Sequence, residues 1–461
     1  MTDFSALISP DRGQSARTLM LVPHAEFTQW LTLQPPRARA AVEAARFEGK
    51  ADSVVILPGE APEEWSVAIG VEPENRLWCL AAAAAKLPEG TYRLAEGAPG
   101  DCALGWLLAQ HRFDRYREKP EVIGARVLLT SEPARIDEIV RLAEATGLVR
   151  DLVDTGAGDL GPAELADAAK AVADKHGARF SVTQGDALRD HYPMIHAVGR
   201  AATKARSPRL IEVEWGDPAH PRIAVIGKGV CFDSGGLDIK PGSGMLLMKK
   251  DMGGAAHAIA LAGLIMATRL PVHLHLLIPA VENAVSAESF RPGDVLTSRK
   301  GLHVEIGNTD AEGRLILADA LTRAGEEAPT LMLDFATLTG AARVALGPDL
   351  PALFANDEVL ARDLIEAGDR VDDPLWRLPL WRPYNEMLKS DIADINNAPG
   401  GGFAGTITAA LFLERFVAAE TPWAHFDTFA WRPTAKPGRP KGGEALGLRA
   451  AWALLQGRFP R

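Results

Sequence analysis

The feature that most constrains the fold of this chain is an alternation of apolar, strand-like runs with helix-like segments in its last two thirds. Runs typical of strands lie at residues 222–226, 272–278, 302–306 and 330–335, and segments typical of helices lie at 254–268 and 315–327. Such an alternation predicts a mostly parallel sheet covered by helices. Ligands of such sheets bind beyond the carboxyl ends of the strands, so the residues that follow each run are candidates for a site.

The first third of the chain is rich in alanine and carries few chemical landmarks. The run at 53–57 is typical of a strand and the amphipathic segment at 135–146 of a helix, while turn residues concentrate at 154–162. We therefore predict an α/β protein with a smaller N-terminal α/β domain at 1–132, a linking helix and connection at 133–162, and a larger domain at 163–461. The larger domain is expected to hold a mixed, mostly parallel sheet sandwiched between helices.

Composition and charge limit the class of protein. A chain of 461 residues with 47% hydrophobic residues suits a soluble protein with two cores. The formal net charge of −10 disfavours nucleic acid and anionic membranes as partners and favours a small polar substrate. The three cysteines, Cys79, Cys102 and Cys231, have no CxxC spacing, so neither a disulfide framework nor a cysteine-based zinc site is indicated and a reducing compartment fits best.

No targeting or membrane segment is expected from the sequence. Residues 1–10 lack a basic segment followed by an apolar core, which a signal peptide requires. The longest apolar stretch, 255–268, contains a histidine and is shorter than the roughly 20 residues of a membrane span. We therefore expect a soluble, cytoplasmic protein without a membrane partner.

Two segments place charged residues among glycines. They are 227–241, which continues to 248–254, and 308–315. Glycine lets the backbone approach a ligand closely, so charged side chains embedded in it are candidates for a positioned site. Each segment alone would more often be an ordinary polar turn, and their combination is what favours a site.

Four carboxylates in these segments indicate a metal site. Crowding them into one pocket would be unfavourable without cations, and two divalent ions about 3.5 to 4 Å apart would balance their charge and activate a water molecule. Two cationic side chains then remain that could stabilise a tetrahedral intermediate. The carboxylates are Asp233, Asp251, Asp310 and Glu312, and the two cations are Lys240 and Arg314.

Competing motifs are weaker. Asp233-Ser-Gly-Gly236 matches part of a serine-protease signature, but Phe232 stands where glycine is usual. The histidines include no HExxH motif. His273 and His275 share a face of an expected strand but have no nearby third ligand, so packing or hydrogen bonding is the better interpretation.

One segment carries a family resemblance. Asn308-Thr-Asp-Ala-Glu-Gly-Arg-Leu315 is identical to the hallmark octapeptide of the leucyl aminopeptidase (cytosol aminopeptidase) family. The resemblance extends over roughly the last two thirds of the chain, through 227–236, 248–254, 390–394 and 423–427. It implies that 163–461 is a catalytic metallopeptidase domain.

The resemblance also implies a set of site residues. One metal would be held by Asp233, Asp310 and Glu312, and the other by Lys228, Asp233, Asp251 and Glu312. Lys240 would polarise the scissile carbonyl, and Arg314 would hold a bicarbonate ion. Residues that match the family's substrate pocket are Met248, Asn308, Thr337, Leu338 and Gly340.

From this resemblance we expect an aminopeptidase that uses two Mn²⁺ or Zn²⁺ ions per subunit. Its substrates would be peptides with leucine or another apolar residue at the N-terminus, and its assembly a homo-hexamer. Leu246 departs from the aspartate common in the family at this position. Two alternatives stay open: a dipeptide such as cysteinylglycine as substrate, and a DNA-binding or regulatory role beside or instead of peptidase activity. The acidic net charge and the lack of a basic arm count against the second.

Overall fold

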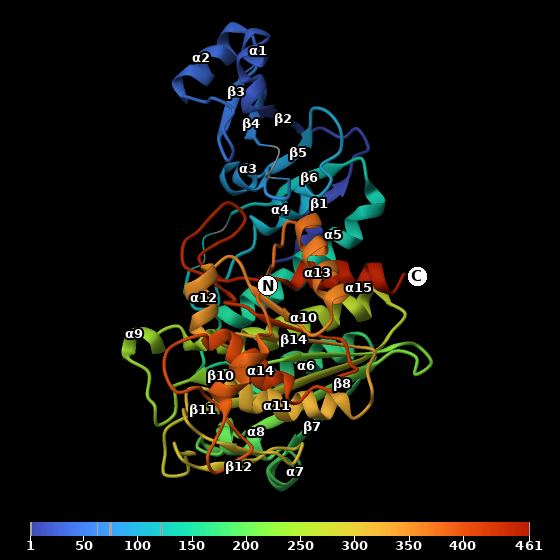
Figure 1. Cartoon of the computed structure of the whole chain (residues 1–461). Coiled ribbons are helices and arrows are strands. Elements are labelled where there is room, and N and C mark those ends of the chain that lie inside the picture. The colour runs from blue at the N-terminus through green and yellow to red at the C-terminus, as the bar shows by residue number, and fades with distance from the viewer. Residues whose placement is uncertain (1, 62, 73–75, 120, 122, 461) are drawn as a thin grey trace. The chain divides into compact units, whose positions relative to one another are not determined.

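The chain forms two compact units. The computed structural model describes residues 2–61, 63–72, 76–119, 121 and 123–460 (Figure 1). One unit comprises Met1–Gly147 with Thr434–Lys441, and the other comprises Leu148–Pro433 with Gly442–Arg461. The division falls within helix α5 (Ile136–Asp154), which continues beyond the segment 135–146 expected from the sequence. The domain division at 1–132, 133–162 and 163–461 stays a prediction.

The first unit is built on a six-stranded sheet in the order β1-β6-β5-β2-β4-β3. Neighbouring strands are parallel except β3 and β4, which are antiparallel. Three successive residues of β4, Val67, Ala68 and Ile69, are buried, which means that both faces of the sheet are covered. The strands and helices are β1 (Ile8–Pro10), β2 (Arg17–Pro23), α1 (Phe27–Thr32), α2 (Pro36–Ala44), β3 (Val54–Pro58), β4 (Trp65–Val71), α3 (Ala81–Lys86), β5 (Gly90–Leu94), α4 (Cys102–Leu108) and β6 (Arg126–Thr130).

One pair of cysteines forms a disulfide, which the sequence did not indicate. Cys79 and Cys102 form a disulfide in the first unit, while Cys231 is a buried free thiol. A disulfide requires only that two Cα atoms come close in space, here 5.9 Å, and the sequence separation of 23 residues gives no hint of this proximity.

The second unit contains a mixed sheet with a parallel centre, as expected from the sequence, but the strand expected at 302–306 lies in a separate three-stranded sheet. Its strands follow the order β16-β15-β18-β14-β9-β11-β8-β7, and β10 pairs with β11. The central strands β18, β14, β9 and β11 are parallel, and antiparallel pairs join β11 to β8, β8 to β7 and β15 to β18. The strands are β7 (Arg179–Gln184), β8 (Arg209–Trp215), β9 (Arg222–Gly227), β10 (Gly229–Asp233), β11 (His273–Asn283), β14 (Leu331–Ala336), β15 (Ala352–Ala355), β16 (Trp376–Arg377) and β18 (Trp423–Asp427).

Helices cover this sheet and bury its apolar side chains. Ala224 and Ile226 of β9 belong to a core with residues of α8, α11 and α14, while α10 lies on the other side of the strands (Figure 1). The helices are α6 (Pro162–Lys175), α7 (Gly185–His191), α8 (Pro193–Gly199), α9 (Gly242–Met245), α10 (Gly253–Thr268), α11 (Glu312–Gly325), α12 (Gly340–Leu346), α13 (Glu358–Arg370), α14 (Gly405–Glu414) and α15 (Leu448–Arg458). The predicted α/β fold class is therefore confirmed.

Short elements complete the second unit. They are the 3₁₀ helix η5 (Met248–Met252) and the strands β12 (Val295–Thr297), β13 (His303–Glu305), β17 (Ile395–Asn396), β19 (Trp431–Arg432) and β20 (Gly442–Gly443). η5 runs directly into α10, and among the described residues the combined helix Met248–Thr268 is the one long and apolar enough to cross a membrane. Its most apolar window is 83% buried inside the protein, as in the core helix of a soluble protein.

Glycines let α10 approach the sheet closely. A Cβ atom added to Gly254 would lie 2.1 Å from the carbonyl oxygen of Phe335 in β14, and one added to Gly227 would lie 2.6 Å from the Cα of Ala255. Larger residues would push the start of α10 away from the ends of β9 and β14. The two glycines therefore hold η5 and its carboxylate beside the carboxyl ends of the strands.

Candidate metal centre

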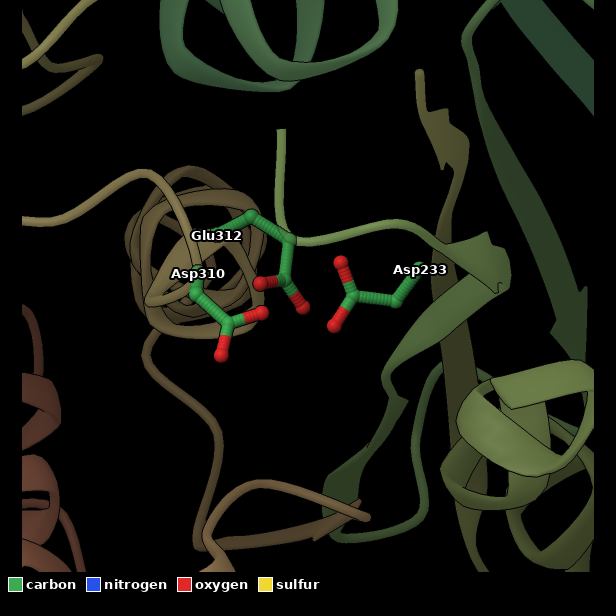
Figure 2. Close-up of side chains that lie close together, drawn as sticks. All are labelled: Asp233, Asp310 and Glu312. Carbon is green, nitrogen blue, oxygen red and sulfur yellow. The ribbon is translucent and has the colours of Figure 1, made fainter. Parts of the chain in front are cut away.

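Three carboxylates meet at the carboxyl ends of the strands. Asp233 is the last residue of β10, Asp310 lies in the loop before α11, and Glu312 is the first residue of α11. One oxygen from each lies within 4.8 Å of the others. Figure 2 shows the three side chains pointing toward a common space, with Asp233 facing the other two. Asp251 of η5 joins this group through the lysine described next.

Two lysines are paired with these carboxylates. The Nζ of Lys228 lies 2.7 Å from Asp251 Oδ2 and 3.0 Å from Glu312 Oε1. The Nζ of Lys240 lies 2.8 Å from Asp233 Oδ2 and also pairs with Asp310. A Cβ atom on Gly313 would lie 2.4 Å from Cε of Lys228, so only glycine leaves room for that side chain.

The carboxylates nevertheless need more positive charge than the lysines supply. Glu312 is buried, and its Oε2 has no hydrogen-bond partner among the described residues. Burial, together with the charge of Asp233, raises the pKa values of Asp310 and Glu312. Buried carboxylates with a free oxygen and unfavourable charge are the ligands that divalent cations require. The residues present therefore fit a metal ion.

Neighbouring polar groups hold the carboxylates in place. Asn283 Nδ2 donates to Asp233 Oδ1 at 2.9 Å, and the backbone N–H of Asp310 donates to Asn308 Oδ1 at 2.7 Å. The hydroxyl of Thr337 donates to Asp251 Oδ1 at 2.8 Å. Such contacts fix the direction of metal-ligating side chains.

A cavity of about 330 Å³ opens beside the carboxylates. The structure brings most of the residues identified from the sequence into its lining, namely Lys228, Asp233, Lys240, Met248, Asp251, Asp310, Glu312, Thr337, Leu338 and Gly340. Among the described residues, Asn308 and Arg314 are not part of the lining. Leu246 is also outside it and is 78% exposed.

Arg314 is buried behind the cavity. Its Nη1 donates to the carbonyl of Asn397 at 2.6 Å, and its Nε has no acceptor within the described ranges. Burial lowers the pKa of Arg314 to about 10, although Glu312 and Asp427 act in the opposite direction. A buried guanidinium with a free N–H is suited to an anion.

The cavity also contains residues that the sequence did not single out. Asp427, at the end of β18, accepts hydrogen bonds from the backbone N–H groups of Leu338 and Thr339, and its position at a strand end could have revealed it. Lys250 lies in the segment 248–254 but was not identified there as a site residue, and Arg343 and Phe429 belong to no motif. Only the tertiary structure brings the three together.

The sequence is similar to that of known aminopeptidases. The family model described as the cytosol aminopeptidase family, catalytic domain, matches residues 147–451, and the M17 aminopeptidase, N-terminal domain, matches residues 18–129. A probable cytosol aminopeptidase of Syntrophotalea carbinolica is 42% identical over 369 residues, which cover 76% of this chain and 73% of that protein. Another from Geobacter sp. (strain M21) is 38% identical over 439 residues, covering 88% and 89%.

Solved structures show the same fold. The cytosol aminopeptidase of Coxiella burnetii has a TM-score of 0.93 and 45% identity, covering 98% of this chain and 99% of that one. The bottromycin maturation enzyme BotP in complex with Mn has a TM-score of 0.86 and 31% identity, covering 96% and 100%. The resemblance seen in the octapeptide is thereby confirmed. The chain belongs to the cytosol (leucyl) aminopeptidase family and is a metal-dependent hydrolase that removes N-terminal residues from peptides.

Proposed function

We propose that this aminopeptidase works with two divalent ions, Mn²⁺ or Zn²⁺, in each subunit. One ion would be held by Asp233, Asp310 and Glu312, and the other by Lys228, Asp233, Asp251 and Glu312. The observation that carries this proposal is the convergence of three carboxylates within 4.8 Å, with Glu312 Oε2 buried and without a hydrogen bond in the described part of the chain. BotP, a relative of the same fold, has been solved with Mn.

Lys228 is an unusual ligand because its amine must lose a proton before it binds a metal. Burial favours the neutral amine, but Asp251 and Glu312 outweigh this effect and raise the pKa of Lys228 in the absence of ions. Two cations beside these carboxylates would cancel their charge and allow the proton to leave. Without metal ions, the protonated Lys228 would therefore pair with the carboxylates. With the ions bound, its neutral amine would be a metal ligand.

The bound ions would supply Lewis acidity for the activation of water and a binding position for the free α-amine of the substrate. Lys240 would donate a hydrogen bond to the scissile carbonyl oxygen and stabilise the negative charge that develops on it. Arg314 would hold a bicarbonate ion through its Nε, which the described residues leave without an acceptor, and a bicarbonate held there would supply a general base.

The side chain of the N-terminal residue would enter the cavity. Met248 and Leu338 give part of its lining an apolar character, which favours leucine and other apolar residues. Thr337 and Gly340 would contact the peptide. Asn308 would act on the substrate indirectly, because its oxygen is already engaged with the backbone of Asp310.

A substrate pair tests this proposal. The metal-loaded enzyme is expected to cleave leucine p-nitroanilide and to leave the N-acetylated analogue untouched, because acetylation removes the amine that binds the metal. Equal hydrolysis of both compounds would contradict amine binding and leave only a general amidase.

We further propose a cytoplasmic location and a homo-hexameric assembly. Several relatives are named cytosol aminopeptidase, which supports the cytoplasmic location, and the family resemblance supports the hexamer. The disulfide between Cys79 and Cys102 is unusual for a reducing compartment, and a thiol count on the purified protein measures whether it is formed.

Analytical ultracentrifugation tests the assembly, and a monomer at micromolar concentration would contradict the proposed hexamer.

A further inference from the structure

A pair formed by the guanidinium of Arg343 and the aromatic ring of Phe429 lines part of the cavity. The guanidinium carbon of Arg343, on α12, lies 4.9 Å from the ring centre of Phe429, which follows β18. The Nζ of Lys250 lies 5.3 Å from the same ring. All three residues line the cavity that holds the candidate metal centre. The two cations therefore add positive charge to the space that a substrate would enter.

The charge of Arg343 is available to a ligand. Lys228 and Lys240 are paired with the carboxylates of the metal centre, and Lys250 lies 3.7 Å from Asp251 Oδ1. No ion pair joins Arg343 to an acidic residue in the described part of the chain, and its side chain is exposed. A guanidinium that lies over an aromatic ring keeps its N–H groups, which point outward in its own plane, free for hydrogen bonds.

The pair is also held in a fixed geometry. Asp427 accepts hydrogen bonds from the backbone N–H and the hydroxyl of Thr339, at 3.1 Å and 2.6 Å. The Thr339 hydroxyl in turn caps α12 by accepting from the N–H of Ala342. The same contact therefore fixes the helix that carries Arg343 and the segment that carries Phe429, which reduces the entropy lost when a ligand binds.

We propose that Arg343, stacked on Phe429, binds a carboxylate of the peptide substrate and so lets this enzyme process acidic substrates as well as apolar ones. This inference rests on the proposed function of the same site. A planar guanidinium and a carboxylate form two parallel charge-assisted hydrogen bonds, which gives both affinity and orientation. The carboxylate belongs either to the side chain of an N-terminal glutamate or aspartate or to the C-terminus of a dipeptide.

Two matched substrate pairs separate these sources. The first compares α-glutamyl p-nitroanilide with glutaminyl p-nitroanilide, which differ only in having a carboxylate or a neutral amide at the end of the side chain. The second compares leucyl-glycine with leucyl-glycinamide, which differ in the C-terminal carboxylate. For each pair, the ratio of kcat/KM values is measured in the metal-loaded wild type, Arg343→Gln and Arg343→Glu.

We expect Arg343→Gln to lower the anionic-to-neutral ratio of at least one pair by about fivefold to tenfold, and Arg343→Glu to lower it further. Arg362→Gln provides the control, because Arg362 is an exposed arginine on α13 outside the cavity. Unchanged ratios for both pairs in both variants would overturn the inference. Failure of the wild type to cleave any leucyl substrate would instead overturn the proposed function, so the two failures are distinguishable.

Discussion

The second unit contains two buried clusters of charge that differ in how completely they are satisfied. One is the candidate metal centre, where Glu312 Oε2 has no hydrogen-bond partner among the described residues. The other surrounds Glu444, whose two oxygens accept from Arg150 at 3.1 and 3.2 Å. Arg432 Nε and the N–H of Ala445 also donate to this carboxylate, at 3.4 and 3.1 Å.

This difference indicates that the cluster around Glu444 stabilises the fold, whereas the candidate metal centre is suited to binding cations. Around Glu444, arginines supply the charge that a buried carboxylate needs, so no further ligand is required. In the metal centre, the carboxylates outnumber the lysines, and burial raises the pKa values of Asp310 and Glu312. Such a cluster is costly in the free protein and is stabilised by a bound cation.

The largest effect that tests this difference is expected for Glu312→Ala. The variant should lose at least about a thousandfold in kcat/KM together with bound metal, because Glu312 is assigned to both ions. It should not unfold at a lower temperature than metal-free wild type, because it relieves the repulsion among buried carboxylates that outnumber the lysines. Leucine p-nitroanilide hydrolysis, metal analysis and calorimetry measure these effects.

Glu326→Ala is the matched control for this variant. Glu326 is exposed, follows the last turn of α11 and pairs with half-buried Arg299, so its removal should leave metal content and turnover intact. Full activity of Glu312→Ala would break the assignment of the first cluster to catalysis.

The cluster around Glu444 should respond in the opposite way: a substitution there should lower stability and leave metal binding intact. Glu444→Gln removes the buried charge that Arg150 and Arg432 share, and we expect it to destabilise the metal-loaded protein by about 3 kcal/mol. Its metal content per folded molecule should be unchanged. Glu366→Gln, at an exposed site on α13, controls for the loss of one charge. Loss of metal by folded Glu444→Gln would remove the distinction between the clusters.

A smaller, pH-dependent effect is expected from the buried pair His425 and Asp334, whose Nδ1 and Oδ1 lie 2.6 Å apart. Burial opposes the charged imidazole, but Asp334 outweighs it and raises the pKa of His425 above 6.5. The ion pair therefore stabilises the folded protein fully below about pH 6.5, and this contribution is lost as the pH rises through the folded pKa.

The melting temperatures of wild type and His425→Gln should accordingly differ most near pH 6 and converge as the pH rises toward 9. Taking the difference at each pH cancels the pH dependence of metal binding. His220→Gln, on an exposed loop, should show no such trend. A difference in melting temperature that grows with pH would show that the imidazole of His425 is neutral in the folded state.

The sequence predicted those parts of the molecule that depend on local pattern. Strands β9, β11 and β14 and the helices at 254–268 and 315–327 follow from periodicity, and residues of the candidate site lie beyond the carboxyl ends of these strands. The run at 302–306 also forms a strand, β13, but this strand belongs to a separate three-stranded sheet. The octapeptide identified the family because an eight-residue identity is very specific. These features need no knowledge of how distant segments pack.

Features that depend on tertiary packing were not predictable. The Cys79–Cys102 disulfide joins segments 23 residues apart, and the stacking of Arg343 on Phe429 joins α12 to the end of β18. Sequence spacing does not encode these contacts, because each depends on how separate elements meet.

The most direct test of the two-metal centre is anomalous diffraction from crystals soaked in Mn²⁺. We predict two manganese peaks about 3.5 to 4 Å apart, with Glu312 and Asp233 in contact with both, Asp310 with one and Lys228 and Asp251 with the other. An anomalous map with no manganese peak among these carboxylates would contradict the account, whether or not manganese binds elsewhere in the crystal.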